Sequence, residues 1–121
     1  MDGKEWQKKT EEAGIEYGKG LERFMGKKTL YHRFLGKFLE DASYRDFCVA
    51  YAAGDLNTSE KTVHTLKGTS GNLSLMRLYR ASDAMVQAIR SKKPADELDA
   101  RAKNVRETYA ETCEAIRAIL A

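Results

Sequence analysis

The sequence predicts an all-α protein, an antiparallel up-down four-helix bundle with a short extra helix at its N-terminus. Apolar residues recur at spacings of three and four along most of the 121-residue chain, which is the period of amphipathic helices. Strand signals are weak, because no Asn-Gly or Asp-Gly turn separates two apolar runs. The connections between helical segments are short, as in up-down bundles. We therefore expect one domain over residues 1–121, with residues 1–13 as an N-terminal helical extension.

The N-terminal quarter predicts two short helices. A polar stretch over Lys4–Glu12 is expected to be helical and to dock through Trp6, the one large apolar residue in it. Residues 13–16 then form the end of this helix and a short extended connection. A second short helix is expected over Tyr17–Met25, closed by Gly26, because glycine suits the left-handed conformation at a helix C-terminus.

A stronger helical pattern follows over residues 30–41, opened by Thr29. The apolar stripe shifts around Ser43, which is a good N-cap residue, and the pattern ends at Ala53-Gly54. This segment is either one kinked helix or two helices. The aromatic residues at helical spacing are expected in the core; they are Phe34, Phe38, Phe47 and Tyr51.

Three longer helices complete the predicted bundle. The first spans Leu56–Leu73, capped by Asp55 or, as an alternative, by a capping box of Asn57 with Glu60. After a turn at residues 73–75, the next spans Met76–Ser91. Pro94 begins a new helix as a first-turn residue, and the last helix, over Asp96–Leu120, keeps one apolar face for more than three turns.

The helix over Leu56–Leu73 has two different faces. One is apolar and consists of Val63, Leu66, Ser70 and Leu73; another consists of Lys61, His64, Gly68 and Gly71. A glycine inside a helix costs about 0.8–1 kcal/mol relative to alanine, and packing alone does not need glycines on an outer face. We infer that another molecule approaches this helix closely around His64.

The residues around His64 suit nucleophilic attack on phosphorus. A histidine that takes up a phosphoryl group needs an exposed ring nitrogen and an unobstructed line of approach. Gly68, one turn later, clears the space beside the ring, and Lys67 brings an ammonium within reach of a phosphoryl group. Glu60, one turn earlier, is either a residue that tunes His64 or an ordinary solvated side chain.

The run His64–Leu73 (HTLKGTSGNL) resembles the signature of histidine-containing phosphotransfer (HPt) domains, His-x-x-Lys-Gly followed by small residues. The resemblance extends over about residues 14–120 and is densest over residues 54–73. It implies a four-helix bundle that relays phosphoryl groups in a multistep His–Asp phosphorelay. The phosphorylated histidine corresponds to His64, with Nε2 as acceptor atom, and the family's lysine and access glycine correspond to Lys67 and Gly68.

The resemblance also implies the partners. An HPt domain has no kinase activity and binds no cofactor; the receiver domain of a response regulator supplies the aspartate and the Mg²⁺, and a hybrid sensor histidine kinase is a further partner. We expect Lys61, Gly71 and Arg77 to contact the receiver. An exposed apolar patch should lie beside the histidine. The residues that we consider for it are Leu21, Phe24 and Met25, which are inward in the helical pattern.

Composition argues against several other functions. The net charge is only +3, with both signs interleaved, so no basic face for nucleic acid is expected. A weak anion preference stays open, and the residues that could supply it are Lys61, Lys67, Arg77 and Arg80. The N-terminus has no signal-peptide pattern and no stretch is apolar enough to span a membrane, which favours a cytoplasmic protein with Cys48 and Cys113 as packed thiols. His32, expected as a surface or boundary residue on its helix, and the two cysteines show no metal-ligand spacing with His64.

Two other functions remain open at this point. The first is a helical interaction or adaptor bundle without phosphorylation, which a His64 buried against another helix would support. The second is the phosphorylated domain of a chemotaxis-type histidine kinase, which shares the bundle and the histidine. A phosphate-binding loop is not supported, since neither Lys27 nor Lys67 stands in a Gly-x-x-x-x-Gly-Lys-Ser/Thr run after a strand.

Overall fold

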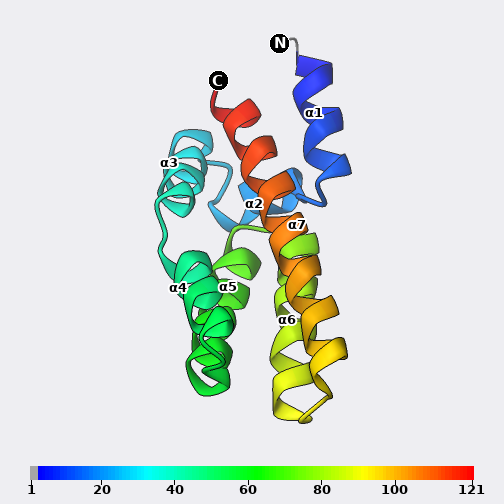
Figure 1. Cartoon of the computed structure of the whole chain (residues 1–121). Coiled ribbons are helices and arrows are strands. Elements are labelled where there is room, and N and C mark those ends of the chain that lie inside the picture. Colours follow the sequence, from blue (N-terminus) through cyan, green and yellow to red (C-terminus); the bar gives the residue numbers. More distant parts are fainter. Residues whose placement is uncertain (1–2) are drawn as a thin grey trace.

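The computed structural model describes residues 3–121; residues 1 and 2, part of the expected N-terminal extension, lie outside the described residues. The described chain is all-helical apart from one isolated β-bridge (Figure 1), so the all-α prediction is confirmed. The helices are α1 (Gly3–Glu12), α2 (Tyr17–Arg23), α3 (Lys28–Leu39), α4 (Ser43–Ala52), α5 (Leu56–Asn72), α6 (Met76–Arg90) and α7 (Ala95–Leu120).

Helices α4 to α7 form the four-helix bundle, and they alternate in direction along the chain (Figure 1). Helix α5 packs between α4 and α6, and α6 packs against α7. Helix α7 returns to α4, where Tyr44 and Tyr109 stack with ring centroids 3.8 Å apart and the Tyr51 hydroxyl donates to Asp99. Burial in this partly apolar contact raises the pKa of Tyr51 to about 12, aided by the hydrogen bond to Asp99.

The N-terminal part contains three helices, α1, α2 and α3, and the sequence analysis expected a helix at each of these places. Helices α1 and α3 both pack against α7, whose C-terminal half lies beside them in Figure 1. The predicted extended connection is confirmed, because Ile15 forms an antiparallel bridge with Leu75. The Gly14 carbonyl accepts hydrogen bonds from the backbone N–H of Met76 (3.0 Å) and Arg77 (3.2 Å). The connection between α1 and α2 is therefore hydrogen-bonded to the turn between α5 and α6.

An aromatic cluster joins α1, α2 and α3. Trp6 packs edge-on against Tyr17 (centroids 4.9 Å apart), which confirms that α1 docks through this residue. The Tyr17 hydroxyl lies 2.6 Å from Nε2 of His32, a half-buried boundary residue as expected. Burial, and then the nearby charge of Lys28, hold the pKa of His32 below its usual value.

Buried Tyr31 lies at the centre of the same cluster and reaches α5. Its ring contacts those of Tyr17 and Phe24, and its hydroxyl donates a 2.7 Å hydrogen bond to the Leu73 carbonyl at the end of α5. Burial raises the pKa of this hydroxyl well above its usual value. The N-terminal cluster is thus tied to the helix that carries His64.

The segment over residues 28–53 is two helices and not one kinked helix, and both predicted starts need correction. Ser43 is the first residue of α4 and not its N-cap, because the Asp41 carboxylate accepts from the Ser43 N–H at 2.8 Å and so satisfies the free backbone group. Helix α3 begins at Lys28, so that Thr29 is its second residue and caps nothing.

Two predicted apolar positions also differ. Phe34 is 38% exposed; its ring lies at the edge of α3, tilted against the ring of Phe24 and with the Lys37 ammonium over it. Met25 was expected inward but is 80% exposed; its φ of 56° ends α2 two residues early. Gly26, by contrast, has the predicted left-handed conformation, with φ of 74°.

Gly20 is required by the packing of Tyr31. A Cβ atom at this position would overlap the Tyr31 hydroxyl and ring, and the ring cannot retreat because it is buried and hydrogen-bonded to Leu73. We expect Gly20→Ala to lower the free energy of unfolding by about 1–3 kcal/mol, as overpacking does, measured by urea unfolding. The control is Gly18→Ala on the same helix, where a Cβ meets nothing within 4 Å. Equal stability of the two variants would contradict this account.

Candidate functional site

Helix α5 begins at a side-chain cap, as the sequence predicts. The Asp55 carboxylate accepts from the Thr58 backbone N–H at 3.0 Å, and hydrogen bonds from Thr58 lower the pKa of this carboxyl below its usual value. The alternative cap is wrong, because Asn57 lies inside the helix. The Asp55 cap fixes where the helix starts and hence which face each later residue occupies.

The apolar face predicted for α5 is confirmed, and His64 is exposed on the outer face. Val63, Leu66, Ser70 and Leu73 are all buried, whereas His64 is exposed. Within residues 3–121 its imidazole makes no hydrogen bond or ion pair. The adaptor hypothesis therefore lacks the observation that would have supported it, a His64 buried against another helix.

Two threonines that follow His64 on α5, Thr65 and Thr69, do not compete for its ring. The hydroxyls of Thr65 and Thr69 donate to backbone carbonyls one turn earlier, on Lys61 and Thr65, at 3.1 Å each. Such bonds satisfy the hydroxyls within the helix backbone. These two side chains therefore leave the imidazole open to an incoming group.

The two glycines of the outer face have different roles. A Cβ atom on Gly68 would meet nothing within 4 Å, so the space beside the imidazole is open, as predicted. A Cβ atom on Gly71 would lie 3.1 Å from the Tyr79 ring on α6. Gly71 therefore lets α6 pack closely against α5, and our expectation that it lies on an open face is wrong. Its role in docking stays a prediction.

Lys67 is turned towards α6. Its Nζ lies 2.9 Å from Oδ1 of Asp83 and 5.7 Å from the centre of the Tyr79 ring, and its side chain is only 22% exposed. The hydrogen bond from Lys67 holds the pKa of the Asp83 carboxyl below its usual value. Sequence reasoning missed Asp83, because this residue comes from a different helix.

A shallow groove of about 350 Å³ lies beside His64. It is lined by Glu60, Lys61, His64, Thr65 and Arg90. Nε of Arg90, at the end of α6, lies 2.6 Å from Oε1 of Glu60. Of the residues predicted for docking, Lys61 lines this groove. Arg90 lines it as well, and sequence reasoning missed this residue. The Glu60 carboxylate is engaged by a guanidinium and is not an ordinary solvated group.

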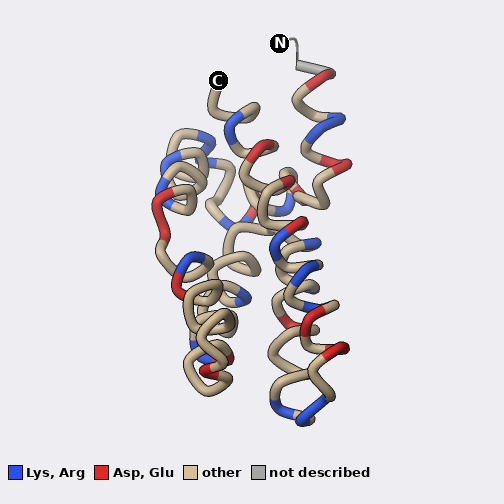
Figure 2. The backbone as a smooth tube through the Cα atoms, viewed as in Figure 1, with Lys and Arg blue, Asp and Glu red and all other residues tan. Residues whose placement is uncertain are grey.

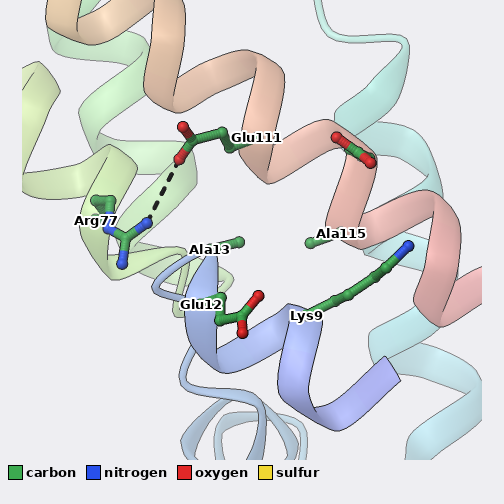
Figure 3. A pocket seen from close by; sticks show the side chains of 7 residues that line it. Lys9, Glu12, Ala13, Arg77, Glu111 and Ala115 are labelled. Atoms are coloured by element: carbon green, nitrogen blue, oxygen red, sulfur yellow. Dashed lines mark hydrogen bonds and ion pairs between the residues drawn. The ribbon is translucent and has the colours of Figure 1, made fainter. Parts of the chain in front are cut away.

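Arg77 lies in a different part of the molecule. It is at the N-terminal end of α6, where its guanidinium is 3.5 Å from the Glu111 carboxylate of α7. Figure 3 shows this ion pair at one side of a cavity of about 440 Å³ between α1 and α7, with Lys9 and Glu12 from α1 also lining it. The structure does not bring Arg77 to the His64 groove, and its predicted contact with a partner is untested.

The different surroundings of the two glycines predict different effects of the same substitution on stability. Gly68→Ala should raise the free energy of unfolding by about 0.8–1 kcal/mol, because alanine is the better helix former and nothing obstructs its methyl group. Gly71→Ala should gain less or become destabilising, because its methyl group must displace the Tyr79 ring. Urea unfolding of both variants checks this, and a Gly71→Ala protein as stable as Gly68→Ala would contradict the assigned roles.

The charged residues and the two cysteines lie as the sequence analysis expects. Basic and acidic residues are interleaved along the described helices, and no element in Figure 2 is uniformly basic. Cys48 is half-buried and Cys113 buried, both as free thiols. Among residues 3–121, no group of three or more His, Cys, Asp and Glu side chains is placed to hold a metal ion. None of the described helices combines the length and the apolar character that crossing a membrane requires.

Comparison with known proteins identifies the family. The family model described as the Hpt domain matches residues 33–120, which is most of the chain and includes the whole of α4 to α7. The match begins later than the resemblance noted in the sequence, so residues 14–32 lie outside it. No curated protein and no solved structure matches the chain. The chain belongs to the Hpt domain family, whose members act in phosphotransfer within two-component signalling.

Proposed function

We propose that this protein is a phosphorelay intermediate, which accepts a phosphoryl group on His64 from the aspartyl phosphate of one receiver domain and passes it to another. The observation that carries the proposal is the exposed imidazole of His64 beside the open space over Gly68. The family supports phosphoryl carriage, and the donor and acceptor named here are our own assignment.

The transfer step places few demands on the protein. The lone pair of Nε2 attacks phosphorus, the bond from phosphorus to the aspartate oxygen breaks, and its electron pair stays on the departing carboxylate. The proton on Nδ1 is retained. A second receiver aspartate reverses these changes. The protein contributes an accessible ring held in line with the phosphate, which is how most phosphoryl-transfer catalysis is achieved.

No cofactor is needed on this side of the complex. We propose that the receiver domain holds the Mg²⁺ that neutralises the phosphate oxygens, while this chain provides the nucleophile alone. Lys67 is the one ammonium on α5 within one turn of His64 on its C-terminal side, and it is suited to offset charge on the phosphoryl group as it arrives.

The experiment that tests the proposal uses a receiver domain charged with ³²P-labelled acetyl phosphate. After removal of excess donor, the receiver is mixed with this protein in the absence of ATP. Label should move to this protein and be lost in acid while surviving in base, as a phosphoramidate bond does. No transfer from any of a panel of receivers, with transfer only from a histidine kinase and ATP, would favour the chemotaxis-type alternative.

A further inference from the structure

Two ion pairs join α5 to α6 on either side of His64. Lys67 pairs with Asp83 at 2.9 Å, and Glu60 pairs with Arg90 at 2.6 Å. In each pair the two residues are equally far from Leu75 along the chain, which is the register expected of an antiparallel helical hairpin. His64 lies one turn from both Glu60 and Lys67 on the helix surface.

The Lys67 ammonium is held firmly on the α6 side. Asp83 binds it at the distance of a charge-assisted hydrogen bond, and the Tyr79 ring, admitted by Gly71, lies beside it. Gln87, one turn after Asp83 on α6, lies with its amide nitrogen 3.4 Å from the same carboxylate oxygen. Lys67 therefore has a partner before any phosphoryl group arrives.

We propose that Asp83 is a positioning residue, which holds the Lys67 ammonium on the α6 side and so weakens its interaction with a phosphoryl group on His64. The phosphoryl group is then passed on to a receiver more easily. The proposal rests on the function proposed above. A phosphoryl group brings about 1.5 to 2 negative charges to the α5 surface, and Asp83 competes with it for one ammonium. The competition weakens the stabilisation of phosphohistidine and favours its discharge to a receiver.

The competition predicts the effect of Asp83→Asn. With the carboxylate removed, Lys67 is free to bind the phosphoryl group fully, and the equilibrium between phosphohistidine and receiver aspartyl phosphate should shift towards phosphohistidine by about threefold to tenfold. That range is typical of a partly exposed, charge-assisted contact. Asp83→Glu should restore most of the wild-type equilibrium, because it keeps the charge.

The test uses the full chain phosphorylated on histidine with phosphoramidate. In that reaction the imidazole nitrogen attacks phosphorus, the P–N bond of the reagent breaks and ammonia leaves. The phosphorylated protein is then mixed with a receiver domain, and the partition of label at equilibrium is measured. The matched control is Glu107→Gln on α7, which removes the same charge from an ion pair with Lys103 and should leave the partition unchanged.

A double-mutant cycle separates positioning from a general effect of charge. In a Lys67→Ala background, Asp83→Asn should no longer shift the partition. An unchanged partition in Asp83→Asn, or the same shift with and without Lys67, would overturn the role of Asp83 while leaving the proposed function intact. Failure of the wild-type phosphoprotein to pass label to any receiver would overturn the proposed function, and this inference with it.

Discussion

Replacing His64 by Gln is expected to abolish acid-labile phosphorylation of this protein by a charged receiver domain. Glutamine has no ring nitrogen with a free lone pair, so no imidazole remains on the outer face of α5 to attack phosphorus. Because His64 is exposed and makes no hydrogen bond or ion pair within residues 3–121, the variant should fold with unchanged stability. Transfer of ³²P label from the receiver, followed by gel separation in alkali, measures the effect.

The second histidine provides the matched control. His32 is half-buried against Tyr17, and its ring is therefore a poor target for a receiver domain. We expect His32→Gln to accept label at close to the wild-type rate. Label that persists in His64→Gln and disappears in His32→Gln would refute the assignment of the site.

Gly68→Gln is expected to slow phosphoryl transfer on the order of 100-fold without unfolding the protein. A glutamine side chain would occupy the open space one turn from His64 and hold the receiver's phosphate away from Nε2. Displacement of the reacting atoms by about 1 Å can cost this much rate. Stopped-flow or rapid-quench measurement of label transfer gives the rate, and urea unfolding reports stability, which should not fall because glutamine is a better helix former than glycine.

Gly18→Gln is the control for the substitution itself. Gly18 also lies in a helix, it is exposed on α2, and a Cβ atom added to it would meet nothing within 4 Å. The transfer rate of this variant should match that of the wild type. A Gly68→Gln protein that transfers as fast as Gly18→Gln would show that access over Gly68 does not matter.

The helices could be predicted because each buries one face. The apolar stripe of α5, from Val63 to Leu73, is buried as its spacing indicates, and the cap at Asp55 forms as expected. The predictions were wrong at positions where a neighbouring side chain changes what the local sequence pattern indicates. At the start of α4 the carboxylate of Asp41 accepts from a backbone N–H, so that a cap by the Ser43 hydroxyl is not needed. At Phe34 the helical spacing is right, but the side chain lies at an edge of α3 that its neighbours leave partly open.

The candidate site could be predicted only along α5. The sequence places His64, Lys67 and Gly68 together because they share one helix, whereas Asp83 and Arg90 reach the site from α6. The sequence does contain one signal for these partners. Once the turn is placed at residues 73–75, residues equally distant from Leu75 should face each other across the hairpin. That register pairs Gly71 with Tyr79 and indicates that Gly71 is not open.

The most direct test of the central claim is to locate the phosphate after transfer from a receiver. Protein labelled by a charged receiver domain is digested at alkaline pH, and the phosphopeptide is sequenced by mass spectrometry. We expect phosphate on His64, in the peptide that also contains Thr62 and Thr65, with ³¹P NMR of the intact protein showing substitution at Nε2. Phosphate on His32, or acid-stable phosphate on a serine or threonine of α5, would contradict the assignment of His64 as the phosphoryl carrier.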